Sequence, residues 1–329
     1  MAPVAEPKPN DGPAPRSDLE GSGRGAAADQ VFRVVALLAG LTVLAVLAGI
    51  AISTTQKAWP AFSKAGLSYI TSTDWNPGQG KFGALAFVYG TVVVSLIAVV
   101  VAVPVSLGIA LFATEVAPRR LRSTITTIMD LLAAVPSVVF GLWGFLVLRP
   151  QLKDIYNSIA DAVSGIPVLN RIFGPSLSGQ SFMTAGLIVA LMITPIITSI
   201  AREVFLTVPR NDKDGALALG ATRWEMITGV VLPHSSGGIV GAVMLGLGRA
   251  MGETIAIALV IGASPQIVAN LFGQGDAMPS VIARNLNESS GDYQAALIGM
   301  GVLLFALTIA INISARRLVV GFDRRLKGT

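Results

Sequence analysis

The stretch DGALALGATRWEMITGVVLP, Asp214–Pro233, is a polar segment between long apolar runs. Residues 216–219 are strong helix formers, and Gly220 follows them where the end of a helix favours a residue that tolerates positive φ. Thr222 and Glu225 have the spacing of a capping box, which predicts that a second helix starts there and leads into the next apolar run. The segment therefore predicts two helices separated by a turn. On the surface of a membrane protein, such a helix–turn–helix unit is typical of a site where another protein docks. The alternative is an amphipathic surface turn that binds no partner.

The composition around this segment is that of an integral membrane protein. The 329 residues are 53% hydrophobic and 13% charged, whereas soluble domains carry roughly 25% charged residues. The chain has no Cys and one His, His234. These counts exclude a disulfide framework, a thiolate nucleophile and a Cys- or His-rich metal cage, so no metal site is expected.

Six apolar runs are long enough to cross a hydrocarbon core of about 30 Å. They predict an all-α integral membrane protein with six transmembrane helices. The predicted spans are Val34–Ile52, Phe82–Phe112, Ile125–Leu148, Phe182–Ile200, Val230–Ile261 and Ala295–Ile313.

The positive charges predict the orientation of these spans. With six spans, 16 of the 24 lysines and arginines lie on the side that holds both termini and the segment around Asp214. The side richer in Lys and Arg is normally cytoplasmic. Both termini are therefore predicted to be cytoplasmic, and so is the loop at residues 210–228.

The chain divides into four predicted regions. Residues 1–30 are rich in Pro, Ala, Gly and Asp and are expected to form a disordered cytoplasmic tail. Residues 31–80 hold the first transmembrane helix and an outward loop. Residues 81–317 form the core transmembrane domain, which includes the cytosolic loop 210–228. Residues 318–329 form a basic cytoplasmic tail.

Arg249 and Glu253 are ionisable residues inside the fifth predicted span. Their spacing of four places them on one face of a continuous helix. A charge at membrane depth costs about 2.5–3.5 kcal/mol on insertion scales, so such residues usually face a bundle interior or a hydrated path. A guanidinium binds oxyanions well, which makes the pair candidates for an anion path. Mutual neutralisation that stabilises helix packing is the alternative.

The chain has no sequence of a catalytic or nucleotide-binding site. No G-x-x-x-x-G-K-[ST] motif occurs, and the glycines at 246, 248 and 252 have the wrong spacing for a dinucleotide-binding loop. The basic residues gather at the ends of apolar runs, which argues against nucleic-acid binding. Any ATP hydrolysis must therefore come from another chain.

The cytosolic loop resembles a signature of bacterial ABC importer permeases, which reads E-A-A, three residues, G, nine residues, I-x-L-P. Here Asp214, Gly215 and Ala216 precede Gly220 by that spacing, and Leu232 and Pro233 close it. The chain departs from the signature with Asp for Glu, Gly for the first Ala and Val for Ile. By resemblance, these six residues form the part that couples to an ATPase.

Three further segments resemble the C-type phosphate permease (PstC) family. They are EVAPRRLRSTITTIMDLLAAVPSVVFGLWG from Glu115, MITPIITSIAREVFLTVP from Met192 and GLGRAMGETIAIALV from Gly246. The resemblance implies a type I ABC importer permease fold in the bacterial plasma (inner) membrane, with Arg249 and Glu253 in the substrate pathway. It also implies an A-type permease partner, two ATPase subunits that bind the ATP, and an extracytoplasmic phosphate-binding protein.

Other readings of the sequence remain open beside a phosphate importer. A permease for molybdate or sulfate would carry the same features, because an arginine does not distinguish tetrahedral anions. A self-contained secondary anion transporter would not need a docking loop and would be expected to contain internal repeats. A role in signalling phosphate status leaves no mark in the sequence.

Overall fold

The computed structural model describes residues 24–327; residues 1–23, which belong to the tail expected at 1–30, and residues 328–329 lie outside the described range. The chain separates into two units, residues 1–53 and residues 54–329. The described part of the first unit is the beginning of helix α1 (Arg24–Ala65), which starts before the expected boundary at residue 31. Its large apolar side chains from Val31 to Ile52 are exposed, as expected for a span that contacts lipid or another chain.

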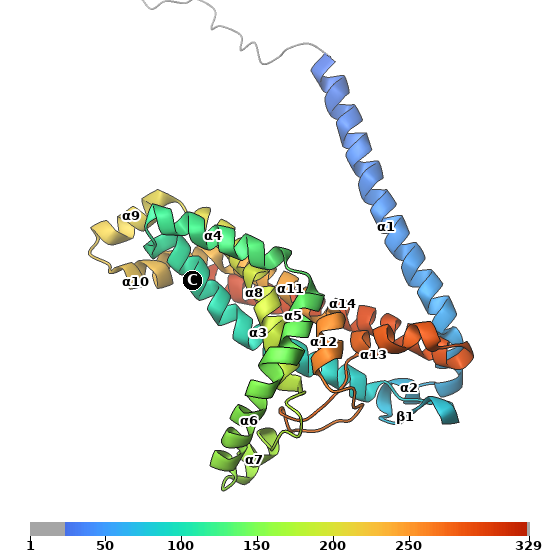
Figure 1. Cartoon of the computed structure of the whole chain (residues 1–329). Coiled ribbons are helices and arrows are strands. Elements are labelled where there is room, and N and C mark those ends of the chain that lie inside the picture. The colour runs from blue at the N-terminus through green and yellow to red at the C-terminus, as the bar shows by residue number, and fades with distance from the viewer. Residues whose placement is uncertain (1–23, 328–329) are drawn as a thin grey trace, which may run out of the picture. The chain divides into compact units, whose positions relative to one another are not determined.

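The second unit is built from helices and one short hairpin (Figure 1). Beyond the end of α1 its elements are α2 (Ser68–Thr71), β1 (Trp75–Asn76), η1 (Pro77–Gln79), β2 (Lys81–Phe82), α3 (Leu85–Leu111), η2 (Phe112–Val116), α4 (Arg119–Ala134), α5 (Ser137–Trp143), η3 (Gly144–Leu148), α6 (Arg149–Val163), α7 (Pro167–Ile172), α8 (Phe182–Leu206), α9 (Arg210–Ala218), α10 (Arg223–Met226), η4 (Ile227–Val231), α11 (Leu232–Gly252), α12 (Ile255–Val260), α13 (Met278–Asn285), η5 (Leu286–Glu288) and α14 (Gly291–Lys327).

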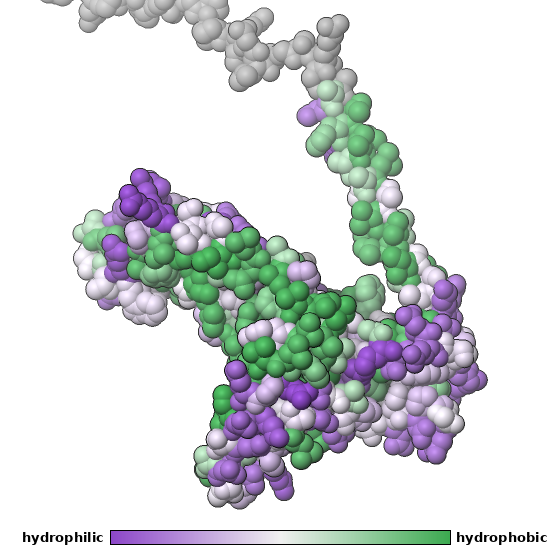
Figure 2. All heavy atoms as spheres, viewed as in Figure 1, coloured by the Kyte–Doolittle hydropathy of each residue, from purple (hydrophilic) through white to green (hydrophobic). Residues whose placement is uncertain are grey.

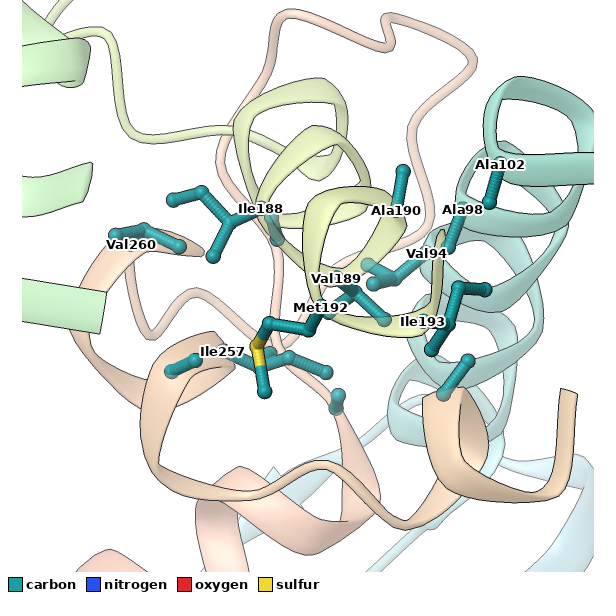
Figure 3. Packing of buried hydrophobic residues seen from close by; sticks show 14 of the residues in the cluster. Val94, Ala98, Ala102, Ile188, Val189, Ala190, Met192, Ile193, Ile257 and Val260 are labelled. Atoms are coloured by element: carbon teal, nitrogen blue, oxygen red, sulfur yellow. The ribbon is translucent and has the colours of Figure 1, made fainter. Parts of the chain in front are cut away.

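Helix α8 is the centre of the main core. The Ser181 hydroxyl caps its start by accepting a hydrogen bond from the Thr184 N–H at 3.0 Å. Figure 3 shows side chains of α8 packed between α3 on one side and α12 on the other. Small residues on α3, Ala98 and Ala102, let the two helices approach closely, and the Ser106 hydroxyl of α3 donates to the Thr194 carbonyl of α8 at 3.1 Å.

A second core forms where α2 and the hairpin pack on α3, α13 and α14. Tyr69 is fully buried, and its hydroxyl donates to the Ala296 carbonyl at 2.5 Å. Burial raises the pKa of the Tyr69 hydroxyl, which keeps the donor protonated. Trp75 of β1 contacts the rings of Phe82, across the hairpin, and Phe87. The outward loop expected between the first two spans is therefore a folded part of the bundle.

Five described helices are long and apolar enough to span a membrane, or up to six if one bent pair counts as a span. The bent pair is Arg119–Ala134 with Ser137–Val163, which meet at 89°. The third predicted span, Ile125–Leu148, is therefore not one straight helix. Val135 is extended and Pro136 follows it; because a proline disfavours helical geometry in the residue before it, the helix stops there.

The predicted span Val230–Ile261 is also interrupted. Helix α11 ends at Gly252, Glu253 has extended backbone angles (φ −68°, ψ 129°), and α12 begins at Ile255. The prediction of one continuous helix through this region is wrong. Non-helical backbone at membrane depth is tolerated where protein or a water-filled cavity surrounds it. Both interruptions are therefore expected to lie in the interior of the bundle.

The surface of this bundle has an apolar band between polar ends. Figure 2 shows apolar residues over α4 and α5, with hydrophilic residues around α9 at one end and around α6 and α7 at the other. The loop at residues 210–228 and the α6–α7 segment thus lie at opposite ends of the apolar band. The sequence predicts the same separation.

Candidate functional site

Glu253 lies at the break between α11 and α12. It is 8% exposed, and its Oε1 accepts a hydrogen bond from the Ala256 N–H at 3.2 Å. The carboxylate thereby satisfies one of the unpaired backbone donors at the start of α12. Thr254, beside it, donates its hydroxyl to the Gly252 carbonyl at 3.0 Å. These side chains replace the backbone hydrogen bonds that the broken helix loses.

Arg249 lies in the last turn of α11 and is exposed. The sequence predicted that Arg249 and Glu253 share one helix face, and this is wrong because the helix ends before Glu253. The ion pairs among the described residues do not include one between these two side chains. The arginine thus keeps donors available for another acceptor, while Glu253 is engaged with the backbone of α12.

The surface around Arg249 is open within this chain. A Cβ placed on Gly248 or on Gly252 would meet nothing within 4 Å among the described residues. Small residues four apart on a membrane helix permit close approach by a second helix. This face of α11 is therefore able to accept another chain beside the arginine.

The two interrupted spans meet through their short helices. A Cβ on Gly141 of α5 would lie 2.8 Å from the Ala256 Cα of α12. Only a glycine permits this contact, so α5 and α12 lie with their backbones close together. The bend at Pro136 and the break at Glu253 precede these two helices in the chain. The packing brings the third and fifth predicted spans together at the site of Glu253.

The loop at Asp214–Pro233 has the predicted local structure. Helix α9 ends at Ala218, and Gly220 has a φ of +91°. The Thr222 hydroxyl accepts from the Glu225 N–H at 3.3 Å, and the Glu225 carboxylate accepts from the Thr222 N–H at 2.7 Å. The helix, the turn and the capping box are confirmed.

One side of the loop packs on the bundle. A cluster centred on Phe205 and Val208, at the end of α8, holds Met226, Ile227 and the partly buried Ala216. The residues of α9 other than Ala216 and Lys213 are exposed, including Asp214 and Gly215. Asp214 and Gly215 therefore face away from the bundle.

The outer side of the loop presents large apolar residues. Leu219 is 91% exposed and Trp224 is 68% exposed. They lie on either side of the turn at Gly220. Apolar and aromatic residues exposed on a rigid turn are typical of contacts with another protein.

Leu232 and Pro233 lie where the loop joins α11. Leu232 is partly buried against the cluster at the end of α8, and Pro233 is exposed in the first turn of α11. A π-helical turn, Ile227–Val231, comes directly before them. A proline cannot donate its backbone hydrogen bond inside a helix, and the wider turn accommodates it. Residues 223–252 thus run as one helical span from the loop to Arg249.

The sequence did not predict the four ion pairs among the described residues, and two of these involve partly or fully buried side chains. Lys213 of α9 binds Glu115 of η2 at 2.7 Å, and Arg284 of α13 binds Asp276. The first pair joins residues 98 apart in sequence, so no local pattern reveals it. For the second, the spacing of Asp276, Ser280 and Arg284 around a helix start was a usable signal: the Ser280 hydroxyl also donates to Asp276 at 2.8 Å.

The described residues hold no group of three or more His, Cys, Asp or Glu side chains placed to bind a metal ion. Among these residues the two sites offer an exposed guanidinium, a buried carboxylate and a capped loop with exposed apolar side chains.

An apolar helical bundle with interrupted spans and a capped, exposed loop at one polar end fits the architecture of an ABC importer permease. Residues 102–328 match the family of the binding-protein-dependent transport system inner membrane component. The chain belongs to this family and is a multi-pass, non-catalytic permease subunit of the inner membrane.

Curated relatives match over nearly the whole chain. The chain is 42% identical to the phosphate transport system permease protein PstC of Xylella fastidiosa (strain Temecula1), covering 92% of this chain and 94% of that protein. It is also 42% identical to PstC of Mesorhizobium japonicum, covering 95% and 97%. PstC 2 of Mycobacterium tuberculosis is 38% identical over 89% of this chain and 92% of its own.

Solved structures agree on the fold. A permease chain from the bacterial alginate ABC transporter, crystallised with its alginate-bound periplasmic protein, has a TM-score of 0.60 at 16% identity, covering 92% of this chain and 98% of that chain. A chain of the MetNI methionine ABC transporter, in an inward-facing conformation, has a TM-score of 0.51 at 16% identity, covering 71% and 93%. The fold is that of the type I ABC importer permeases.

Proposed function

We propose that this chain is one of two permease subunits of an ATP-driven importer of inorganic phosphate and forms half of its translocation pathway. The observation that carries the proposal is the 42% identity to phosphate transport permeases over 92% and 95% of the chain. The interrupted spans and the docking loop supply the parts that such a subunit needs.

Arg249 is the proposed anion-binding group of the pathway. Phosphate near neutral pH carries one to two negative charges, and a guanidinium offers it two parallel hydrogen bonds. The exposure of Arg249, next to the open face at Gly248 and Gly252, supports this role. The partner permease would cover that face, so that the arginine would line a path between two subunits.

Glu253 has the proposed role of limiting affinity. Its buried carboxylate lies one residue beyond the end of α11 and holds the start of α12. A negative charge near the arginine weakens the binding of an anion that must also leave. Glu253 would therefore favour release, and its hydrogen bond to Ala256 would fix the shape of the path.

The loop at residues 210–228 is the proposed ATPase docking element. Asp214, Gly215 and Ala216, with Gly220, would form the coupling helix and its end, and Leu232 and Pro233 would join it to α11. The exposure of Leu219 and Trp224 supports a contact with another protein. ATP would bind to two ATPase subunits on the cytoplasmic side, and this chain would need no cofactor of its own.

The remaining partners follow from this assignment. An A-type permease would complete the pathway, a phosphate-binding protein would dock at the extracytoplasmic end, and lipid would surround the bundle. Both termini would lie in the cytoplasm, as the Lys and Arg distribution predicts.

The test is uptake of labelled phosphate by proteoliposomes that contain this chain, the A-type permease, the ATPase and the binding protein. ATP-dependent uptake is expected, with unlabelled phosphate competing and sulfate or molybdate not competing. Arg249→Gln should abolish uptake without loss of assembly, whereas Arg120→Gln, a charge removal at an exposed position of α4, should not. Uptake without any ATPase, or wild-type uptake by Arg249→Gln, would refute the assignment.

A further inference from the structure

Helix α9 is tied to the bundle by a partly buried ion pair. The Lys213 Nζ lies 2.7 Å from the Glu115 Oε1, and the two side chains are only 16% and 9% exposed. Glu115 belongs to η2, the π-helical turn that ends α3. Of the four ion pairs among the described residues, this one has the lowest side-chain exposure averaged over both partners.

Lys213 also reaches the end of α8. Its Nζ donates to the Phe205 carbonyl at 3.4 Å, where the last carbonyls of a helix carry partial negative charge. A single ammonium group therefore bridges α9, the end of α3 and the end of α8. Ala216, one turn further along α9, contacts the apolar cluster beneath.

These two residues are the whole inner face of α9. Lys213 and Ala216 are partly buried, and the other seven residues of the helix are exposed. Residues three apart lie on the same side of a helix. The orientation of α9 thus depends on one small apolar contact and one ion pair. Of these two contacts, only the ion pair depends on direction, because its hydrogen bond must be aligned.

Removing one partner of such a pair leaves the other charge enclosed and unpaired, which costs far more than the loss of an exposed pair. Lys213 and Glu115 are therefore expected to stay paired when α9 is displaced. A displacement of α9 is passed to the ends of α3 and α8, in addition to the covalent route through α10 and α11.

We propose that Lys213 and Glu115 are positioning residues that transmit movement of the ATPase-docking loop to α3 and α8. This inference rests on the proposed function of the loop and adds a second route from it into the bundle. The covalent route moves the helix that carries Arg249, and the ion pair moves the two helices packed against that helix. The bundle then responds as a unit and not through α11 alone.

The test is a charge exchange in the complete transporter, read as phosphate imported per ATP hydrolysed. Lys213→Glu and Glu115→Lys should each lower this ratio by about tenfold, within the range of ordinary coupling between sites, while the ATPase remains bound. The double exchange should restore the ratio to near the wild-type value. The neutral pair Lys213→Met with Glu115→Gln, which removes both charges together, serves if a single exchange prevents assembly, and it should also lower the ratio.

A matched control is the exchange of Arg202 and Glu203, an adjacent pair near the end of α8 whose Glu203 side chain is 65% exposed. This exchange should leave the ratio unchanged. A purely structural role for Lys213 and Glu115 would lower the yield or the melting temperature of the single variants but not the ratio, and that result would overturn the inference. So would single variants with a wild-type ratio.

A separate variant distinguishes failure of the ion-pair inference from failure of the proposed function of the loop. Leu219→Asp alters the exposed side of the loop and should release the ATPase, with loss of both ATP-dependent uptake and co-purification. If Leu219→Asp releases the ATPase and the single charge variants keep a wild-type ratio, only the ion-pair inference is wrong. If the ATPase stays bound and coupled in Leu219→Asp, the docking function of the loop is wrong.

Discussion

Replacing Gly141 with alanine tests whether the contact between α5 and α12 shapes the pathway. The added Cβ would lie 2.8 Å from the Ala256 Cα and 2.9 Å from a methyl carbon of Leu259, whereas ordinary contacts are 3.4–4 Å. The leucine side chain can rotate away, but the Ala256 Cα is backbone. The variant therefore forces α5 and α12 apart.

The size of this displacement follows from the contact distances. Raising 2.8 Å to the shortest ordinary contact, 3.4 Å, moves the backbone of α12 by about 0.6 Å. Overpacking of this kind costs about 1–3 kcal/mol, against a gain of up to about 1 kcal/mol from the better helix propensity of alanine. Because Glu253 is bonded to the Ala256 N–H at 3.2 Å, the carboxylate must follow α12 or lose that hydrogen bond.

We expect Gly141→Ala to lower ATP-dependent phosphate uptake about tenfold, since an error of about 1 Å at a working site costs up to about 10²-fold. The assay is uptake in proteoliposomes, with co-purification of the ATPase as the check on assembly. Gly108→Ala on α3 is the matched control, because its Cβ would meet nothing within 4 Å. It should transport normally.

A second variant tests whether the obstructing atom belongs to the backbone of α12. Adding Ala256→Gly to Gly141→Ala removes a methyl group but not the close Cα, so uptake should stay low. Wild-type uptake by an assembled Gly141→Ala transporter would show that the close approach of α5 and α12 does not shape the path. Rescue by Ala256→Gly would show that the obstructing atom is a side chain and would refute the backbone argument.

Three further predictions concern stability and assembly. Thr222→Ala removes the capping box with Glu225 and should cost about 0.5–2 kcal/mol, visible as faster proteolysis within the loop. Gly220→Ala places a side chain at a φ of +91° and should cost about 1–2 kcal/mol, with weaker ATPase co-purification; a normal yield of complex would contradict it. Asp276→Ala leaves Arg284 unpaired beside a buried site and should cost about 3–5 kcal/mol, measured as a lower melting temperature in detergent, whereas removing both partners should cost less.

The sequence predicted the features that depend on neighbouring residues. The turn at Gly220 and the capping box of Thr222 and Glu225 are set by local hydrogen bonds and by one backbone angle, so their spacing in the sequence was enough. The apolar runs predicted a membrane protein because the length and hydropathy of a run are also properties of consecutive residues. The family signature in the loop then narrowed the class to importer permeases.

The remaining features depend on contacts between distant segments. The bend at Pro136 had a visible signal, but a proline inside an apolar run can either kink a span or end it, and packing decides between the two. The break at Glu253 had no such residue; it depends on a carboxylate that caps α12 and on the close contact of Gly141 with Ala256. The pair of Glu115 and Lys213 joins the π-helical turn η2 to helix α9, two elements that only the folded bundle brings together.

The break at Glu253 has a consequence for the proposed anion path. In a continuous helix, Arg249 and Glu253 would be neighbours at a spacing of four and would attract one another strongly in a medium of low dielectric constant. Each would then satisfy the other, and an incoming phosphate would have to displace the carboxylate from the guanidinium. Because α11 ends at Gly252, the carboxylate instead accepts the Ala256 N–H, and Arg249 keeps its donors. The interruption of the helix therefore separates the buried acid from the arginine, as the proposed role of Glu253 in limiting anion affinity requires.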